Sequence, residues 1–178
     1  MPRVSDMKER LTDAAIELMW ENSYGSTSVD AICDRAGAKK RAYMDSVFSP
    51  TVPPIERLER YFDSMHDGLA ERQQQCGSIL GCPMLAIGSE ICTQDQLVRE
   101  TIDRILDTKM NYFVSAIRDA HAQGVIHAPD PHMKAKALFA CYHGVLSQAR
   151  VQNDLELVRE FKHIALDLLG VKHAAATA

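Results

Sequence analysis

The stretch STSVDAICDRAGAKK, residues 26–40, contains the most specific local pattern in the chain. Thr27 can cap a short helix, and Asp30 stands at the third helical position, where a carboxylate favours the helix N-terminus. Gly37 ends the pattern, because glycine tolerates a left-handed turn best. Lys39 and Lys40 follow at once. A short helix, a tight turn and basic residues together predict a helix-turn-helix, with a DNA-reading helix to follow.

Helical periodicity continues on both sides of this stretch. Upstream, one apolar stripe of a helix is formed by Leu11, Ala14, Ala15, Leu18 and Met19. Downstream, the same period predicts helices over residues 55–69, from 83, from 93 to near 124, from 130, and from 153 to 170. Thr93 with Gln96, and Asp130 with Pro131, are typical helix starts. We find no strand pattern, so the sequence predicts an all-α fold.

The expected domain order is a helix-turn-helix DNA-binding domain over residues 1–46, then a helical domain over 47–172 and a frayed tail over 173–178. The boundary lies near Ser49-Pro50 and Pro53-Pro54, since proline lacks an N–H donor and restricts its predecessor. The second domain is expected to be an antiparallel helical bundle.

Composition restricts the class of protein. Of the 178 residues, 46% are hydrophobic and 25% are charged, which is ordinary for a globular protein. The apolar runs are too short to span a membrane, and the N-terminus lacks the apolar core of a secretion signal. Five cysteines without framework spacing favour free thiols in a reducing compartment. We therefore expect a cytoplasmic protein that does not bind membranes.

Charge alone does not predict a nucleic-acid partner. The net charge is −4, and residues 1–44 carry seven Lys or Arg against seven Asp or Glu, a sum of zero. Any affinity for DNA must therefore come from a local basic patch rather than from the field of the whole protein.

The chain resembles the TetR family of bacterial transcriptional repressors. The resemblance begins with Tyr24-Gly25, Thr27-Ser28-Val29, Ile32, Ala36-Gly37 and Lys40, and continues in GCPMLAIGSE (81–90) and DPHMKAKALFACYHGVLSQARV (130–151). It implies a homodimer whose helix-turn-helix heads bind a double-stranded DNA operator, and whose helical domains bind a small-molecule effector.

One segment departs from the family pattern. In the family, a recognition helix and the start of a long fourth helix follow the AG-x-x-K turn. Here Arg41-Ala42-Tyr43-Met44 occupies those positions, and the linker-like VFSPTVPPIERL (47–58) comes directly after Asp45-Ser46. Either the chain is truly shortened, or a disordered recognition helix is missing from the sequence between about Lys40 and Tyr43. We expect the second, and with it a break in the Cα trace.

The resemblance places DNA contacts on Thr27, Ser28, Lys39, Lys40 and Arg41. The hydroxyls and free N–H groups at a helix N-terminus suit a phosphate, and the basic side chains suit the DNA backbone. A plainer interpretation is that Thr27 only caps its helix and that the lysines are merely solvated.

Candidate effector-binding residues lie on the inward faces of the predicted helices: Phe62, Met65, His66, Met84, Ile87, Phe113, Ile117, Tyr142 and His143. Many such Met and Phe stripes are simply core. Cys82 is a further candidate, because it precedes Pro83 at a predicted helix N-terminus, where a thiolate is favoured. Some TetR-like repressors carry a cysteine in a similar Gly-Cys motif and respond to electrophiles or oxidants. The alternative for Cys82 is an inert, half-buried residue.

No catalytic, cofactor or metal-binding motif stands out, so we expect neither an enzyme nor a bound cofactor or metal. A thiol enzyme with Cys82 as nucleophile and His66 or His143 as base is the weaker alternative. A homodimer interface is expected on the last two helices, at Val145, Gln148, Val158, Phe161, Ile164 and Leu168. The predicted function is a ligand-responsive repressor, released from a palindromic operator by a small molecule or a thiol-reactive compound. The alternative is a helical sensor that has lost DNA binding through a true deletion.

Overall fold

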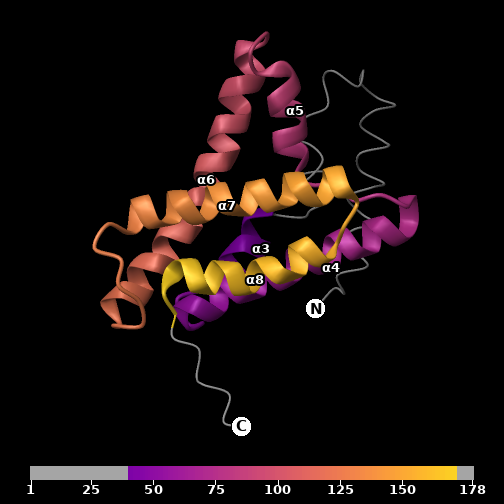
Figure 1. Cartoon of the computed structure of the whole chain (residues 1–178). Helices are drawn as coiled ribbons and strands as arrows, with labels where there is room; N and C mark the ends of the chain where they lie inside the picture. Colours follow the sequence, from indigo (N-terminus) through magenta and orange to yellow (C-terminus); the bar gives the residue numbers. More distant parts are fainter. Residues whose placement is uncertain (1–39, 172–178) are drawn as a thin grey trace. The chain divides into compact units, whose positions relative to one another are not determined.

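The computed structural model describes residues 40–171 (Figure 1). Within them the chain forms six α-helices and no strand, which confirms the all-α class for this part. The helices are α3 (Lys40–Val47), α4 (Pro54–Cys76), α5 (Pro83–Ile91), α6 (Gln96–Ala122), α7 (Pro131–Gln152) and α8 (Glu156–Leu169). The chain divides into two compact units, Met1–Val47 and Phe48–Ala178.

In the first unit, α3 is continuous from Lys40 to Val47. The break expected between Lys40 and Tyr43 is therefore wrong. The segment KRAYMDSV contains neither proline nor glycine, and Lys, Arg, Ala and Met have high helix propensity, so the helical backbone continues through it. The helix ends before Ser49, whose helical conformation is disfavoured by the proline that follows it. A helix thus stands directly after the predicted turn, where the resemblance places the recognition helix.

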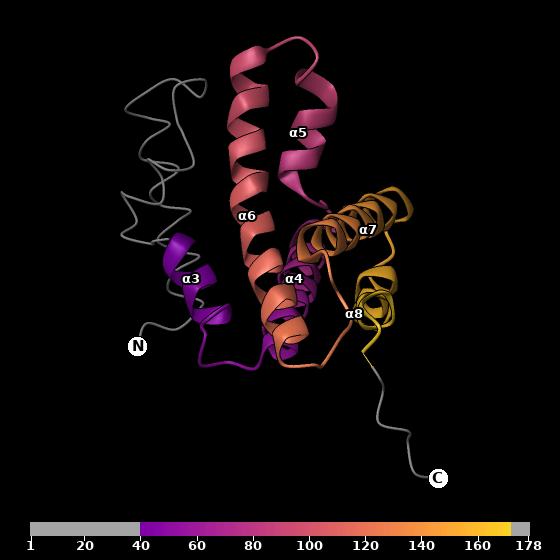
Figure 2. The ribbon, with the colours of Figure 1, turned by 90° about the vertical axis from the view of Figure 1, so that its left-hand side faces the viewer.

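In the second unit, the four longer helices pack around a common core. α7 packs against α6 and α8, and α4 packs against the same two helices from the other side. Figures 1 and 2 show α5 beside the N-terminal half of α6, where both extend beyond α7. α5 packs mainly against α6. None of the helices in residues 40–171 combines the length and the apolar character that crossing a bilayer requires.

Several helix ends follow from local sequence, as predicted. Pro83 is the first residue of α5, with Cys82 in the cap position. The Asp130 carboxylate caps α7 by accepting a hydrogen bond from the Met133 N–H at 2.9 Å. Gly170 ends α8 with a positive φ of 73°. These signals are local, which is why they could be read from the sequence.

Two predicted ends are wrong. α6 is capped by Asp95 and not by Thr93, since the Asp95 carboxylate accepts from the Val98 N–H at 2.9 Å. α4 does not end before residues 72–75 but continues to Cys76 and stops at Gly77, which has a φ of 75°. Arginine and glutamine are good helix formers, so a polar run on an exposed helix face does not end it.

The core of the second unit is aromatic. Phe113 is fully buried, and its ring lies edge-on to Tyr61 and to Phe139, with ring centroids 5.3 Å apart in both pairs. Edge-to-face pairs at this distance add to the free energy gained from burial alone. Further rings contribute to the same cluster: Phe48, Phe62, Tyr112, Tyr142 and Phe161. These residues bring α4, α6, α7 and α8 together.

Asn153 fastens the connection between α4 and α5 to the end of α7. It ends α7 in a left-handed conformation, with a φ of 53°. Its side-chain oxygen accepts from the Ile79 N–H at 2.9 Å, and its amide donates to the Gly77 carbonyl at 3.1 Å. One side chain therefore holds the first part of the short connection before α5.

Arg57 is the buried charged residue among those that the structure describes, and its side chain is only 3% exposed. Its Nη1 donates to Asp119 Oδ2 on α6 at 2.7 Å. Its other donors reach backward along the chain, from Nε to the Val52 carbonyl at 2.8 Å and from Nη2 to the Pro50 carbonyl at 3.3 Å. One guanidinium therefore joins the linker after α3 to α4 and α6.

We expect Arg57→Met to lower the free energy of unfolding by about 2–4 kcal/mol, because a partly buried carboxylate and two carbonyls lose their donor. Arg60→Met is the matched control on the same helix. Arg60 pairs with Glu56 at the surface, with its side chain 53% exposed, and its loss should cost less than about 1 kcal/mol. Urea unfolding of both variants measures this difference. Equal losses would show that the Arg57 contacts are not structural.

Candidate functional site

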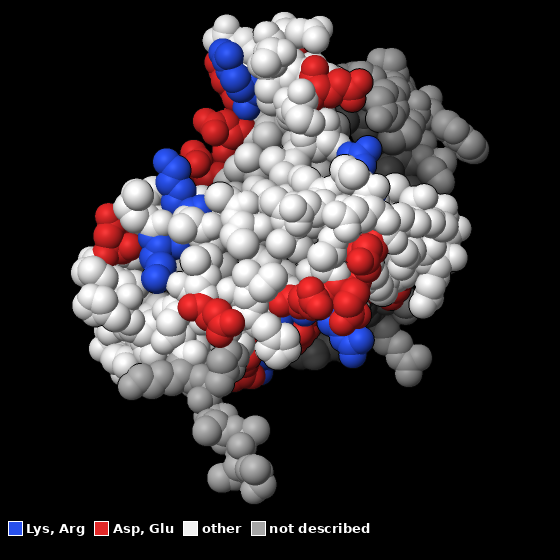
Figure 3. All heavy atoms as spheres, viewed as in Figure 1, with Lys and Arg blue, Asp and Glu red and all other residues white. Residues whose placement is uncertain are grey.

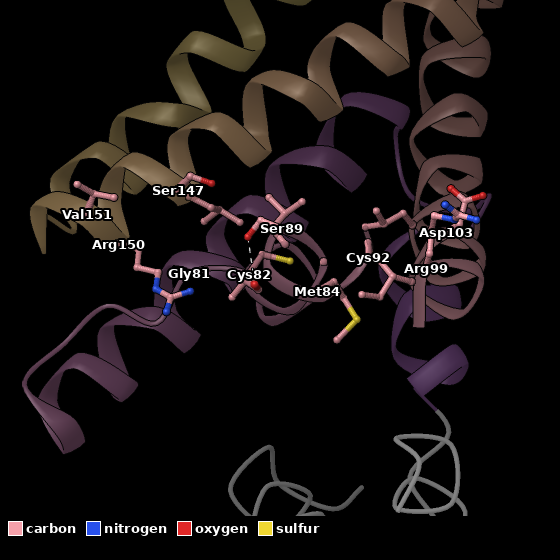
Figure 4. Close-up of a pocket in the computed structure, with 16 residues that line it drawn as sticks. Gly81, Cys82, Met84, Ser89, Cys92, Arg99, Asp103, Ser147, Arg150 and Val151 are labelled. Atoms are coloured by element: carbon pink, nitrogen blue, oxygen red, sulfur yellow. Dashed lines mark hydrogen bonds between the residues drawn. The ribbon is translucent and has the colours of Figure 1, made fainter. Parts of the chain in front are cut away.

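A cleft of about 630 Å³ lies between α5, α6 and α7 (Figure 4). This volume is within the range of small-molecule sites. The connection before α5 supplies Gly81 and Cys82, and the residue that follows α5 is Cys92. The three helices supply the other lining residues: Met84, Leu85, Ala86, Gly88, Ser89, Arg99, Ile102, Asp103, Leu106, Leu146, Ser147, Arg150 and Val151.

The floor of the cleft depends on the sequence around Gly81. Gly81 has a φ of 66°, a conformation that favours glycine. A Cβ at this position would lie 3.2 Å from the Leu146 carbonyl oxygen and 3.3 Å from Arg150 Cβ. The glycine thus lets the connection lie close against α7, so that α5 begins beside α7 and leaves the cleft between them.

The charges in the cleft are arranged at its two ends. Figure 4 shows Arg150 beside Gly81 on one side and Arg99 with Asp103 on the other. The structure gives no side-chain hydrogen bond or ion pair to any of the three within the described residues. Between them the lining is mainly apolar. This arrangement can accept a ligand with an apolar body and a polar or charged end.

Two thiols also line the cleft. Cys82 is buried, with 7% of its surface exposed, and Cys92 is half-buried. They stand at opposite ends of α5, in the cap positions. Across a helix of this length the two sulfurs are about 15 Å apart, too far for a disulfide. Cys76 is exposed, and its Sγ lies 3.0 Å from the Arg72 carbonyl oxygen.

The predicted effector residues fall into two groups. Cys82 and Met84 lie in the cleft. The inward-facing residues Phe62, Phe113, Ile117 and Tyr142 are instead packed in the core, each at most 3% exposed. These residues face inward because the helices pack against one another through them, and this packing leaves no space for a ligand at their side chains.

The remaining predicted effector residues lie elsewhere. Met65 is half-buried and lines, with Phe62 and Tyr142, a gap too small for a water molecule. His66 is half-buried on α4, with its Nδ1 3.2 Å from Asp67 Oδ1. Ile87 belongs to α5, but its side chain lies outside the described part. None of these three side chains is placed in the cleft.

His143 is partly buried on α7, one turn before the cleft residue Ser147. Its ring lies against Phe139, with centroids 4.3 Å apart, and its buried Nε2 has no hydrogen-bond partner within the described residues. Burial, assisted by the positive charge of Lys109, lowers the pKa of His143 from 6.5 to about 4. The ring is therefore neutral at physiological pH.

The predicted DNA-binding residues are mostly outside the described part. The described part does not include Thr27, Ser28 and Lys39. It begins with Lys40 and Arg41, which form the first turn of α3. Of the predicted interface residues, Val158 and Phe161 are buried in the core of their own chain. Gln148 and Ile164 are exposed on α7 and α8, and Val145 and Leu168 are half-buried.

The sequence analysis did not select Arg99, Asp103 and Arg150. Arg150 could have been noticed in the sequence, because it is an isolated charge near the end of α7. The other charged residues of that helix are Lys134 and Lys136, near its start. Arg99 and Asp103 belong to a helix with many charges and carried no such signal. In residues 40–171, no group of three or more His, Cys, Asp or Glu could hold a metal ion.

The neutral His143 makes stability depend on pH. Between pH 6.5 and about 4, the unfolded chain binds a proton at this position and the folded chain does not, so stability falls as the pH falls through this window. We expect both His143→Phe and His143→Gln to weaken this dependence, with up to about one proton fewer taken up on unfolding. Urea unfolding at several pH values measures the slope. Slopes like that of the original chain in both variants would contradict the assignment.

Comparisons with known families cover both units. Residues 54–165 match the family described as tetracyclin repressor-like, C-terminal domain. Residues 11–42 match bacterial regulatory proteins of the tetR family. The first match alone spans more than half of the chain. No curated protein is similar enough in sequence to match it.

Solved structures share the fold. The regulatory protein TetR from Rhodobacter sphaeroides aligns with a TM-score of 0.62 and 20% identity, over 89% of this chain and 96% of that one. A TetR transcription regulator from Haloarcula marismortui aligns with a TM-score of 0.58 and 16% identity, over 93% and 97%. The reduced form of E. coli NemR aligns with a TM-score of 0.50 and 16% identity, over 94% and 100%. At these identities the likeness shows the fold alone.

The two sequence matches are consistent with the structure, which has a helix after the predicted helix-turn-helix turn and a separate helical unit. Members of the family are DNA-binding regulators rather than enzymes, and they bind small-molecule effectors and act as dimers. The chain belongs to the TetR family of bacterial transcriptional regulators.

Proposed function

We propose that the protein is a homodimeric repressor that is released from a palindromic operator when a small molecule occupies the cleft between α5, α6 and α7. The observation that carries this proposal is the cleft itself, about 630 Å³ in the unit that matches the tetracyclin repressor-like domain. The full aromatic core leaves no comparable space among the residues that the structure describes.

For DNA binding, we propose that α3 acts as the recognition helix. The first turn of a recognition helix is the part that contacts base edges, and here this turn contains Lys40 and Arg41. Thr27, Ser28 and Lys39 would add contacts to the phosphate backbone. A local basic cluster of this kind is needed because the net charge of the chain is −4.

The signal from the cleft would travel along α6. Ile102 and Leu106 line the cleft, whereas Asp119, about 20–25 Å further along the same helix, binds Arg57. Arg57 in turn holds the carbonyls of the linker that follows α3. A ligand that prefers one position of α6 would therefore bias the linker and, with it, the spacing of the DNA-binding heads.

A thiol-reactive effector is a second form of the same proposal. Cys82 lines the cleft and stands in the cap position of α5. Addition of the Cys82 thiol across the carbon–carbon double bond of an α,β-unsaturated carbonyl compound would form a carbon–sulfur bond, break the π bond and place the thiol proton on the α-carbon. The adduct would occupy the cleft. The same route along α6 would then transmit the change.

The proposed dimer interface is the outer surface of α7 and α8. Figure 3 shows an uncharged area over α7, with charges toward the two ends of the helix. Exposed residues of small or apolar type lie on α7: Ala137, Ala140, Gly144 and Val151. On α8, Ile164 is 43% exposed. Burial of this surface against a second copy would remove it from water.

The alternative function is a helical sensor that does not bind DNA. The observation that favours it is the continuity of α3, which has only eight residues and shows no break where a longer segment was expected. A truly shortened head offers less surface to an operator. DNA binding decides between the two functions.

We expect the protein to select a palindromic duplex from a random DNA library, and the double variant Lys40→Gln with Arg41→Gln to bind it more weakly. The preference for the selected duplex over a random duplex should also fall, because two side chains assigned to base edges are lost. Lys136→Gln, on α7 in the second unit, is the control and should bind as the original chain does. Fluorescence anisotropy measures both. If no duplex is selected, the sensor function stands instead.

We expect Ile164→Asp to shift the protein from dimer to monomer at micromolar concentration, because a carboxylate would be buried without a partner in the proposed interface. Leu97→Asp is the matched control. Leu97 is 71% exposed at the start of α6, away from the proposed surface. Light scattering gives the mass of each variant. A dimer that survives Ile164→Asp, or dissociates equally with Leu97→Asp, would contradict the interface.

A further inference from the structure

We propose that the ligand of the cleft is an elongated molecule with an apolar body and one anionic end group, and that Arg150 binds that group. This inference rests on the proposed function only in taking the cleft as the effector site. The class of ligand follows from the side chains that line the cleft.

The middle of the cleft is suited to an apolar body. Its lining there comes from three helices and contains no charged side chain: Met84, Leu85, Ile102, Leu106 and Leu146. Burial of an alkyl or aryl group against these residues contributes about 25 cal/mol for each Å² removed from water. A methionine in such a wall can adapt to the shape of the ligand, since its side chain is unbranched.

Arg150 provides an unused positive charge. Among the described residues, its guanidinium makes no hydrogen bond or ion pair, in contrast to Arg57, Arg60 and Arg159, which pair with carboxylates. A guanidinium presents a planar set of donors that fits a carboxylate or a sulfonate in two-point contact. The cleft therefore contains an anion-binding group whose partner is not supplied by the described part of the chain.

The stem of Arg150 lies against the backbone of Gly81. A Cβ on Gly81 would lie 3.3 Å from Arg150 Cβ and 3.4 Å from its Cδ, so the bare glycine backbone allows the arginine stem to pack directly on it. The positive φ of Gly81 also disfavours any other residue there. A stem packed in this way keeps Arg150 beside Gly81 at one end of the cleft (Figure 4) and loses less conformational freedom when a ligand binds.

The opposite end of the cleft is a poorer site for an anion. Arg99 is accompanied there by Asp103, whose carboxylate offsets its charge (Figure 4). Two arginines and one aspartate give the lining a net charge of +1, which disfavours a cationic ligand. The anionic group is therefore assigned to the Arg150 end and the apolar body to the space toward α6.

The test measures binding of hexanoate, decanoate and tetradecanoate, together with the neutral alcohol of each length, by isothermal titration calorimetry. The original chain should bind at least one carboxylate about tenfold more tightly than its alcohol, as a charge-assisted hydrogen bond would give. Arg150→Gln should remove this preference and leave the alcohol affinity unchanged. The control is Arg72→Gln on α4, another exposed arginine without a partner among the described residues, and it should keep the preference.

Two further variants test the planar donors of Arg150 and the position of its stem. Arg150→Lys keeps the charge without the planar donors and should retain part of the preference. Gly81→Ala should weaken carboxylate binding, because it displaces the arginine stem. The proposal is overturned if carboxylates and alcohols bind equally, if none of them binds, or if Arg150→Gln weakens both classes to the same extent.

The outcome is distinguishable from failure of the proposed function. If decanoate binds with the Arg150-dependent preference but does not change the affinity for the selected duplex, the ligand class stands and the coupling fails. If an electrophile or another neutral compound releases the duplex while the carboxylates do not bind, the regulator stands and the ligand class is overturned. Anisotropy with the same duplex and the same compounds gives both results.

Discussion

The contacts of Arg57 are the constraint on which the organisation of the second unit depends. A buried guanidinium must have its donors satisfied, and here they are satisfied by one carboxylate and two linker carbonyls. These acceptors belong to α6 and to the segment that leads from α3 into α4. The chain therefore cannot move α6 relative to α4 without changing the hydrogen bonds of the linker. The Arg57–Asp119 ion pair therefore couples a displacement of α6 to a change in the linker.

The second unit has a filled core in one region and a cleft for a ligand in another. Aromatic rings such as Phe113 and Tyr61 fill the space between α4, α6 and α7, so that this region is rigid and closed. Space for a ligand remains where α5 begins close against α7, a position fixed by Gly81 and by the hydrogen bonds of Asn153. The cleft and the linker are consequently far apart and share α6 as their common element. Such an arrangement lets occupancy of one site affect the other without direct contact.

The sequence was sufficient where the cause of a structure is local. Asp130 with Pro131 predicted the start of α7 correctly, because a cap and its acceptor lie within one turn. The sequence did not predict contacts between residues that are far apart in the chain. Arg57 and Asp119 are separated by 62 positions, and no pattern in either segment indicates the other. Periodicity identified Phe62 and Phe113 as inward-facing, but an inward-facing residue can line a cavity or fill it, and only packing decides which. Cys82 was found because it adjoins a helix start, whereas Arg150 reaches the cleft only through the approach of α7 to Gly81.

Hydrogen–deuterium exchange tests most directly whether occupancy of the cleft reaches the linker through Asp119 and Arg57. With decanoate bound, the account predicts changed exchange at Ile102 and Leu106 and also at Val52, whose N–H donates to the Ser49 carbonyl at 3.0 Å. In Asp119→Asn, the change at Val52 should be lost while that at Ile102 and Leu106 remains. A change confined to the cleft in the original chain, or one that reaches Val52 equally in Asp119→Asn, would contradict the account.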